Sequence, residues 1–136
     1  QLENSVIRDT PQAMTPNTEV AMILKDLRLD ANISESKRLA CAVQRSLVNS
    51  PFLKKNGFKP KDRGVKQALF HVLLGADMPS ILVELGFITH PKDRALVLSP
   101  KGRSLIARTL TQALMDFKNQ RSSVLAQREL SRCQIH

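Results

Sequence analysis

The sequence predicts an α/β fold with an incomplete sheet. Two stretches with helical periodicity come first, two short apolar stretches without a helical stripe follow, and two more helical stretches come last. Successions of this kind build layers of helices on a sheet. Two strands make a small sheet for this many helices, so we expect strands upstream of Gln1 to complete it.

The N-terminal residues are predicted to form a strand, a loop and a helix. Residues 3–8 fit a short strand, and residues 9–17, which contain two prolines, fit a loop. A helix follows a cap at Asn17 or Thr18. Its apolar residues recur at the spacing of one helix face, and they are Val20, Ile23, Leu24 and Leu27.

A second helix is predicted from about Ser34, and Pro51 marks its end. Its apolar stripe consists of Leu39, Ala40, Val43 and Leu47. Residues 54–66 are basic and rich in glycine and proline, which predicts a surface loop.

The two apolar stretches cover residues 68–74 and 80–87, with a turn at 75–79 between them. Both are short, and the near-continuous apolar run of the second is typical of a central, buried strand.

Two helices are predicted after the strands. One covers residues 91–98 and the other begins at Pro100, each with proline at its first position. The buried face of the second consists of Ile106, Leu110, Ala113, Leu114 and Phe117. We therefore expect one domain over residues 1–118 and a polar tail over 119–136.

The chain is strongly basic, with 21 Lys and Arg against 12 Asp and Glu and a net charge of +9. This charge fits an acidic partner such as nucleic acid, an anionic membrane surface or an acidic cell-wall polymer, and it equally fits a solvated basic surface. No stretch approaches the roughly 18 apolar residues of a membrane span. The N-terminus has neither an initiator Met nor a signal-peptide pattern, so it is interpreted as an internal start.

The spacing of the cysteines and histidines does not indicate a metal site or a required disulfide. Cys41 lies in an apolar helical pattern and Cys133 in the polar tail; a disulfide between them is possible, but their spacing does not require one. His71, His90 and His136 form no ligand pair, and no nucleotide-binding or zinc-protease motif is present.

Glu84 is the candidate functional residue. It follows the apolar run 80–83 and precedes Gly86, which places an ionisable group at the end of a predicted strand. Ligand crevices of α/β sheets form at strand ends, so we expect Glu84 on the floor of a cleft. The alternative is a structural ion pair with a neighbouring Arg or Lys.

A longer pattern surrounds this glutamate. Residues 65–73 contain Val-Lys-Gln-Ala, then Phe70, then Val-Leu; residues 78–88 read Met-Pro-Ser-Ile-Leu-Val-Glu-Leu-Gly-Phe-Ile, followed by Pro91. This pattern resembles the C-terminal signature of bacterial cell-wall amidases, the zinc-dependent N-acetylmuramoyl-L-alanine amidases, and the resemblance extends over about residues 17–117.

The resemblance implies a mixed central sheet flanked by helices. It also implies hydrolysis of the amide between N-acetylmuramic acid and the L-alanine of the stem peptide, with one Zn²⁺ and Glu84 as general base and acid. Peptidoglycan is then the substrate, an activator protein is a possible partner, and the location is periplasmic or extracellular.

The sequence departs from the family in two places. The His, Glu and His that hold zinc precede the matching region and have no counterpart here, and His90 replaces an Asn that would cap the following helix. We therefore expect a hydrolase fragment that is inactive alone. The alternatives are an inactive module that binds peptidoglycan or a partner and, on charge alone, a nucleic-acid-binding domain.

Overall fold

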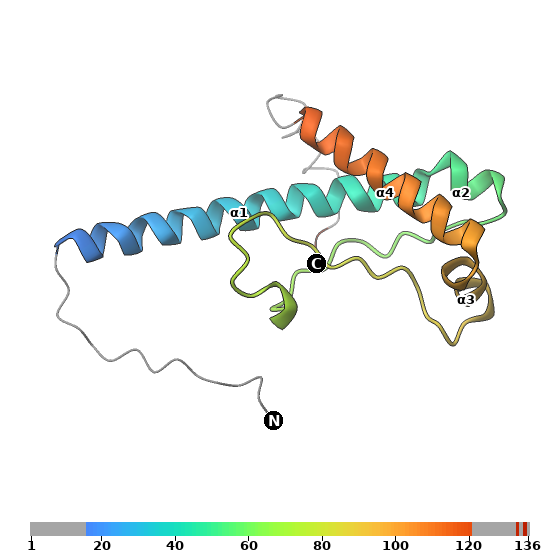
Figure 1. Cartoon of the computed structure of the whole chain (residues 1–136), viewed down its shortest axis with the longest axis horizontal. Helices are drawn as coiled ribbons and strands as arrows, with labels where there is room; N and C mark the ends of the chain where they lie inside the picture. The colour runs from blue at the N-terminus through green and yellow to red at the C-terminus, as the bar shows by residue number, and fades with distance from the viewer. Residues whose placement is uncertain (1–15, 121–132, 134, 136) are drawn as a thin grey trace.

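The structure is a computed structural model that describes residues 16–120 together with Cys133 and Ile135. The described elements, in chain order, are α1 (Pro16–Asn49), α2 (Pro51–Lys55), the 3₁₀ helix η1 (His71–Leu73), α3 (Pro91–Leu98) and α4 (Pro100–Gln120). Helix α4 crosses the second half of α1, and α2 and α3 also pack on α4 (Figure 1). The fold of this part of the chain is therefore helical.

The predicted α/β fold class is wrong for the described residues. They contain no sheet, and their one β pairing is an isolated parallel bridge between Val65 and Ile135. The stretch 68–74 contains η1 instead of a strand, and the stretch 80–87 has no paired strand beside it among the described residues. A strand exists only when another strand accepts and donates its backbone hydrogen bonds, and the described residues supply no such neighbour.

Residues 81–84 of this stretch nevertheless alternate between half-buried and exposed side chains. Ile81 and Val83 pack against the hydrophobic core, whereas Leu82 and Glu84, which alternate with them, are exposed. Alternation of this kind places one face of an extended segment on the core. The prediction of a central, buried strand is therefore wrong in both respects, since 80–87 has no paired strand among the described residues and none of its residues is buried.

Helix α1 is continuous where the sequence predicted two helices. Residues 28–34 contain no glycine or proline, so nothing in the backbone interrupts the hydrogen-bond ladder there. The short helix α2 was not predicted. Pro51 ends α1 and occupies the first turn of α2, and the Ser50 hydroxyl caps α2 by accepting the N–H of Leu53 at 3.3 Å.

The core lies between α1 and α4. Its buried centre consists of Leu39 and Val43 from α1 and Ala113 from α4. Around it pack the partly buried side chains of Leu47, Ile81, Val83, Leu110 and Phe117. The predicted stripe of α4 is confirmed except at Leu114, which is 50% exposed.

The first half of α1 projects beyond this helical pack (Figure 1). Its predicted apolar face is not covered by any described residue, and Val20, Ile23, Leu24 and Leu27 are 52% to 60% exposed. The helices predicted at 91–98 and from Pro100 are confirmed as α3 and α4. The strand predicted at 3–8 and nearly all of the loop at 9–17 and the tail at 119–136 lie outside the described residues.

Replacing Leu53 by Ala is expected to lower the free energy of unfolding by about 2–5 kcal/mol, because truncating a buried leucine leaves a cavity. Leu53 is 1% exposed, whereas Leu114 is 50% exposed and provides the matched control. Urea denaturation should show little change for Leu114→Ala. Equal losses for the two variants would contradict the burial of Leu53 that these exposures indicate.

Candidate functional site

Glu84 lies on the segment that joins η1 to α3. Its side chain is exposed and forms no ion pair or hydrogen bond with another described residue. The segment itself is held at its start, where the Ser36 hydroxyl of α1 accepts the N–H of Ser80 at 2.9 Å, and along one face by Ile81 and Val83. Glu84 does not line the pocket described below, and both its expected place on the floor of a cleft and its catalytic role stay predictions.

The turn that follows Glu84 is held by Asp93. One carboxylate oxygen of Asp93 accepts the N–H of Phe87 at 3.0 Å, and the other lies 3.2 Å from Nδ1 of His90. The N–H of His90 also donates to the carbonyl of Phe87 at 2.9 Å. We call this set of contacts among Phe87, His90 and Asp93 the Asp93 clasp. It fixes the path of the chain between Glu84 and α3.

Gly86 makes room for the Asp93 clasp. Its φ of 138° lies in a region that residues with a side chain rarely adopt. A Cβ atom at this position would lie 2.8 Å from the nearer carboxylate oxygen of Asp93. Asp93 is therefore the group that lies close to the backbone of Gly86.

Asp93 was not predicted from the sequence, although its position in the first turn of a helix indicates such a role. Asp93 is the third residue of α3 after Pro91, and an acidic side chain there commonly reaches back to N–H groups before the helix. His90, at the N-cap position, makes no side-chain capping hydrogen bond. This agrees with the expectation that His caps this turn poorly.

The histidines and carboxylates do not gather into a metal site within the described residues. His71 and His90 are exposed on separate elements, and no described group of three or more His, Cys, Asp or Glu side chains is placed to hold a metal ion. His136 lies outside the described residues.

The basic loop is attached to α1 through Asp62. The amide of Gln44 on α1 donates to the Asp62 carboxylate at 2.7 Å, and the N–H of Gly64 donates to the same oxygen at 2.9 Å. These two hydrogen bonds, the Gln44 one foremost, hold the pKa of Asp62 below its usual value. These hydrogen bonds therefore stabilise the fold fully at pH values above the ordinary pKa of an aspartate. That stabilisation is lost as the pH falls through the lowered pKa of Asp62.

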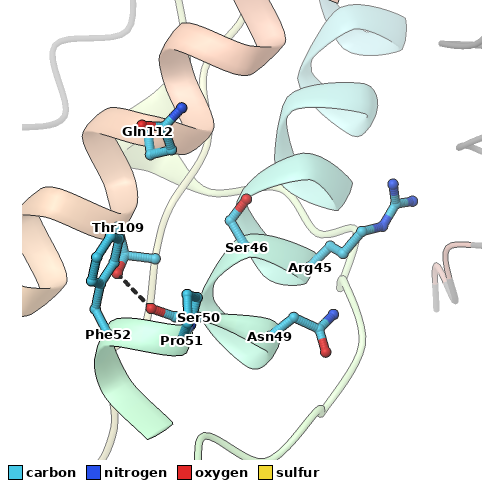
Figure 2. Close-up of a pocket in the computed structure, with 8 residues that line it drawn as sticks. All are labelled: Arg45, Ser46, Asn49, Ser50, Pro51, Phe52, Thr109 and Gln112. Carbon is cyan, nitrogen blue, oxygen red and sulfur yellow. Dashed lines mark hydrogen bonds between the residues drawn. The ribbon is translucent and has the colours of Figure 1, made fainter. Parts of the chain in front are cut away.

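A pocket of about 310 Å³ opens between α1, α2 and α4 (Figure 2). It is lined by Arg45, Ser46, Asn49, Ser50, Pro51, Phe52, Thr109 and Gln112. Its buried hydroxyls are already engaged, since Ser50 and Thr109 bond each other at 2.9 Å and Thr109 donates to the carbonyl of Leu105. The lining contains no carboxylate or histidine, so this pocket offers no proton-transferring group for hydrolysis.

Replacing Gly86 by Ala is expected to destabilise the fold by more than the same change at Gly57. Gly57 also has a positive φ, of 81°, but a Cβ there meets no atom within 4 Å. The Gly57 variant therefore bears only backbone strain, about 1–2 kcal/mol, whereas the Gly86 variant must also displace Asp93. Urea denaturation measures both losses.

A double-mutant cycle identifies the cause. In an Asp93→Ala background the extra loss at Gly86→Ala should shrink, because the clashing carboxylate is gone. Full additivity of the two substitutions would contradict the role given to the Asp93 clasp.

Comparison with known sequences identifies the family. The family profile described as N-acetylmuramoyl-L-alanine amidase matches residues 17–116. That region contains Glu84, the Asp93 clasp and the α1–α4 core. No solved structure gives a significant match.

Two individual relatives carry the same description, and a third is uncharacterised. The N-acetylmuramoyl-L-alanine amidase AmiC of Neisseria meningitidis serogroup B is 30% identical over 103 residues, which cover 76% of this chain and 23% of AmiC. The N-acetylmuramoyl-L-alanine amidase LytC of Bacillus subtilis is 45% identical over 60 residues, or 44% of this chain and 11% of LytC. The uncharacterised protein YqiI of Bacillus subtilis is 45% identical over 58 residues, or 43% of this chain and 25% of YqiI.

The aligned region spans only 11% to 25% of the length of these curated relatives. The family profile, in contrast, covers most of the present chain. The resemblance found in the sequence is thereby confirmed: the chain belongs to the N-acetylmuramoyl-L-alanine amidase family.

Proposed function

We propose that this chain forms the C-terminal part of a peptidoglycan amidase domain that cleaves the amide between N-acetylmuramic acid and the L-alanine of the stem peptide. Glu84 is the residue that exchanges protons with the reacting groups. The observation that supports this role is an exposed carboxylate, without an ion pair among the described residues, on a segment held at both ends. A structural salt bridge, the alternative role for Glu84, has no partner in the described part of the chain.

The chemistry requires a group that first accepts and then donates a proton. As a base, the Glu84 carboxylate takes a proton from the attacking water; as an acid, it returns a proton to the amide nitrogen while the C–N bond breaks. The segment positions this carboxylate from two sides, through Ile81 and Val83 on the core before it and the Asp93 clasp after it. A held backbone limits the orientations of the side chain relative to a bound substrate.

The described residues do not fit the zinc ion that the family generally uses. A catalytic zinc needs about three protein ligands, and no described group of His, Cys, Asp or Glu meets that need. In this proposal the metal ligands come from outside the described residues, and Glu84 is not one of them.

We place the protein at the cell wall, in the periplasm or outside the cell. The Cys41–Cys133 disulfide supports this location, because disulfides persist in oxidising compartments. The net charge of +9 suits an anionic wall polymer. Among the described helices, none has the length and apolar character needed to cross a membrane.

A second candidate function is an inactive module that binds peptidoglycan. The lack of a metal-binding group among the described residues favours it, as does the exposure of basic side chains at the end of α2 and in the loop that follows. These side chains are Lys54 and Lys55 of α2 and Lys59, Lys61, Arg63 and Lys66 of the loop. The two candidates make the same prediction for the isolated chain and differ for the zinc-loaded enzyme.

The isolated chain of 136 residues is expected to bind zinc weakly and to release no stem peptide from muropeptides. Calorimetric zinc titration and chromatography of muropeptide digests measure the two properties. Tight stoichiometric zinc binding would show that this chain holds the metal by itself, and released peptide would show that it suffices for the reaction. Either result would overturn the proposal that the isolated chain lacks a complete active site.

In the zinc-loaded enzyme, Glu84→Gln is expected to lower turnover by about 10²–10⁴-fold, with little change in substrate affinity. Gln keeps the size of the side chain but cannot accept the proton. Glu19→Gln, the same change at an exposed position of α1, is the matched control and should leave turnover unchanged. Normal turnover with a lowered melting temperature for Glu84→Gln would assign Glu84 a structural role instead.

A further inference from the structure

The C-terminal residues Cys133 and Ile135 attach to two separate parts of the molecule. Cys133 forms a disulfide with Cys41 of α1, across 92 positions of sequence. Ile135, two residues later, pairs with Val65 in a parallel β-bridge. We call these two residues, Cys133 and Ile135, the C-terminal strap. It links α1 to the end of the basic loop by one covalent and one backbone attachment.

The basic loop meets α1 at the same place. Asp62, three residues before Val65, accepts a hydrogen bond from Gln44, and Gln44 lies three residues after Cys41 on α1. Residues three apart on a helix share a face. The disulfide and the Asp62 contact therefore hold the strap and the loop on one turn of α1, with the Val65–Ile135 bridge joining them.

The two attachments differ in strength. An isolated bridge has no neighbouring pairs to support it, and its few backbone bonds must offset the entropy of ordering two chain segments. The disulfide keeps Ile135 near Val65, which raises its effective concentration at that backbone edge. The bridge therefore depends on the disulfide.

We propose that the C-terminal strap is a redox-controlled cover of the backbone edge at Val65, closed when Cys41 and Cys133 are joined and open when they are reduced. Opening consumes two electrons and two protons. A thiolate of a dithiol reductant attacks the sulfur of Cys133, a half-buried residue, and expels Cys41 as a thiolate; the second thiol then releases Cys133, and the reductant leaves as a cyclic disulfide. Both cysteines end as thiols.

The change is local because the core does not include the strap. The buried cluster is formed by α1 and α4 alone, and Cys41, although 4% exposed, is not among its members. An open strap leaves the edge of the chain at Val65 available to another extended segment, since unpaired backbone groups accept added strands. This inference does not rest on the proposed amidase activity.

Hydrogen exchange of the full chain, followed by mass spectrometry, tests the proposal. Peptides covering residues 62–68 should exchange several-fold faster after treatment with dithiothreitol than in the oxidised chain. The same acceleration is expected for Cys133→Ser without reductant. Peptides from α4 should exchange at an unchanged rate in every state.

Two further variants separate the bridge from the disulfide. An oxidised chain ending at Cys133 keeps the disulfide and lacks Ile135, and it should show the fast exchange at 62–68; Ile135→Ala keeps the backbone and should remain slow. Unchanged exchange at 62–68 on reduction would overturn the proposal. Equal acceleration in α4 would also overturn it, because the disulfide would then stabilise the whole fold instead of controlling one edge.

Discussion

The packing of α4 across the second half of α1 is the interaction on which the rest of the described structure depends. Leu39, Val43 and Ala113 meet there, and they form its buried centre. Helices α2 and α3 pack on α4, and the segment that carries Glu84 lies against the same cluster through Ile81 and Val83. Few apolar side chains are fully buried, so each of these contacts accounts for a large share of the hydrophobic stabilisation.

The helices could be predicted from sequence because their signals are local. Proline at the first position located the starts of α3 and α4, and the spacing of Leu39, Val43 and Leu47 identified the face of α1 that packs on α4. The continuity of α1 as one helix could also have been predicted from the absence of glycine and proline near its middle. Ser34 was given too much weight there, since serine interrupts a helix far less than either of those residues.

The sheet could not be predicted correctly because strand pairing is not local. The near-continuous apolar run around Val83 indicates an extended segment, whereas a strand also needs a neighbour that this stretch of sequence does not encode. The disulfide was left open for a similar reason, since only the folded chain shows whether Cys133 reaches Cys41. Asp93 is the one site feature that local reasoning could have found, from its place in the first turn after Pro91.

Family membership and the structure each describe a different aspect of the candidate site. Family membership assigns the region around Glu84 to an amidase, and the structure shows how that region is held, by the core before Glu84 and by Gly86 and the Asp93 clasp after it. The exposed face of the first half of α1 and the unpaired stretch 80–87 both present apolar side chains that no described residue covers.

The central claim is that the α1–α4 core positions the segment that carries Glu84. A double-mutant cycle between Val43→Ala and Val83→Ala, measured by urea denaturation, tests it most directly. Because both side chains belong to the same packed cluster, we expect a coupling energy of about 0.5–3 kcal/mol. The parallel cycle between Val43→Ala and Leu82→Ala, whose side chain is 48% exposed, should be additive. Additive losses for Val43 and Val83, within about 0.3–0.5 kcal/mol, would contradict the claim.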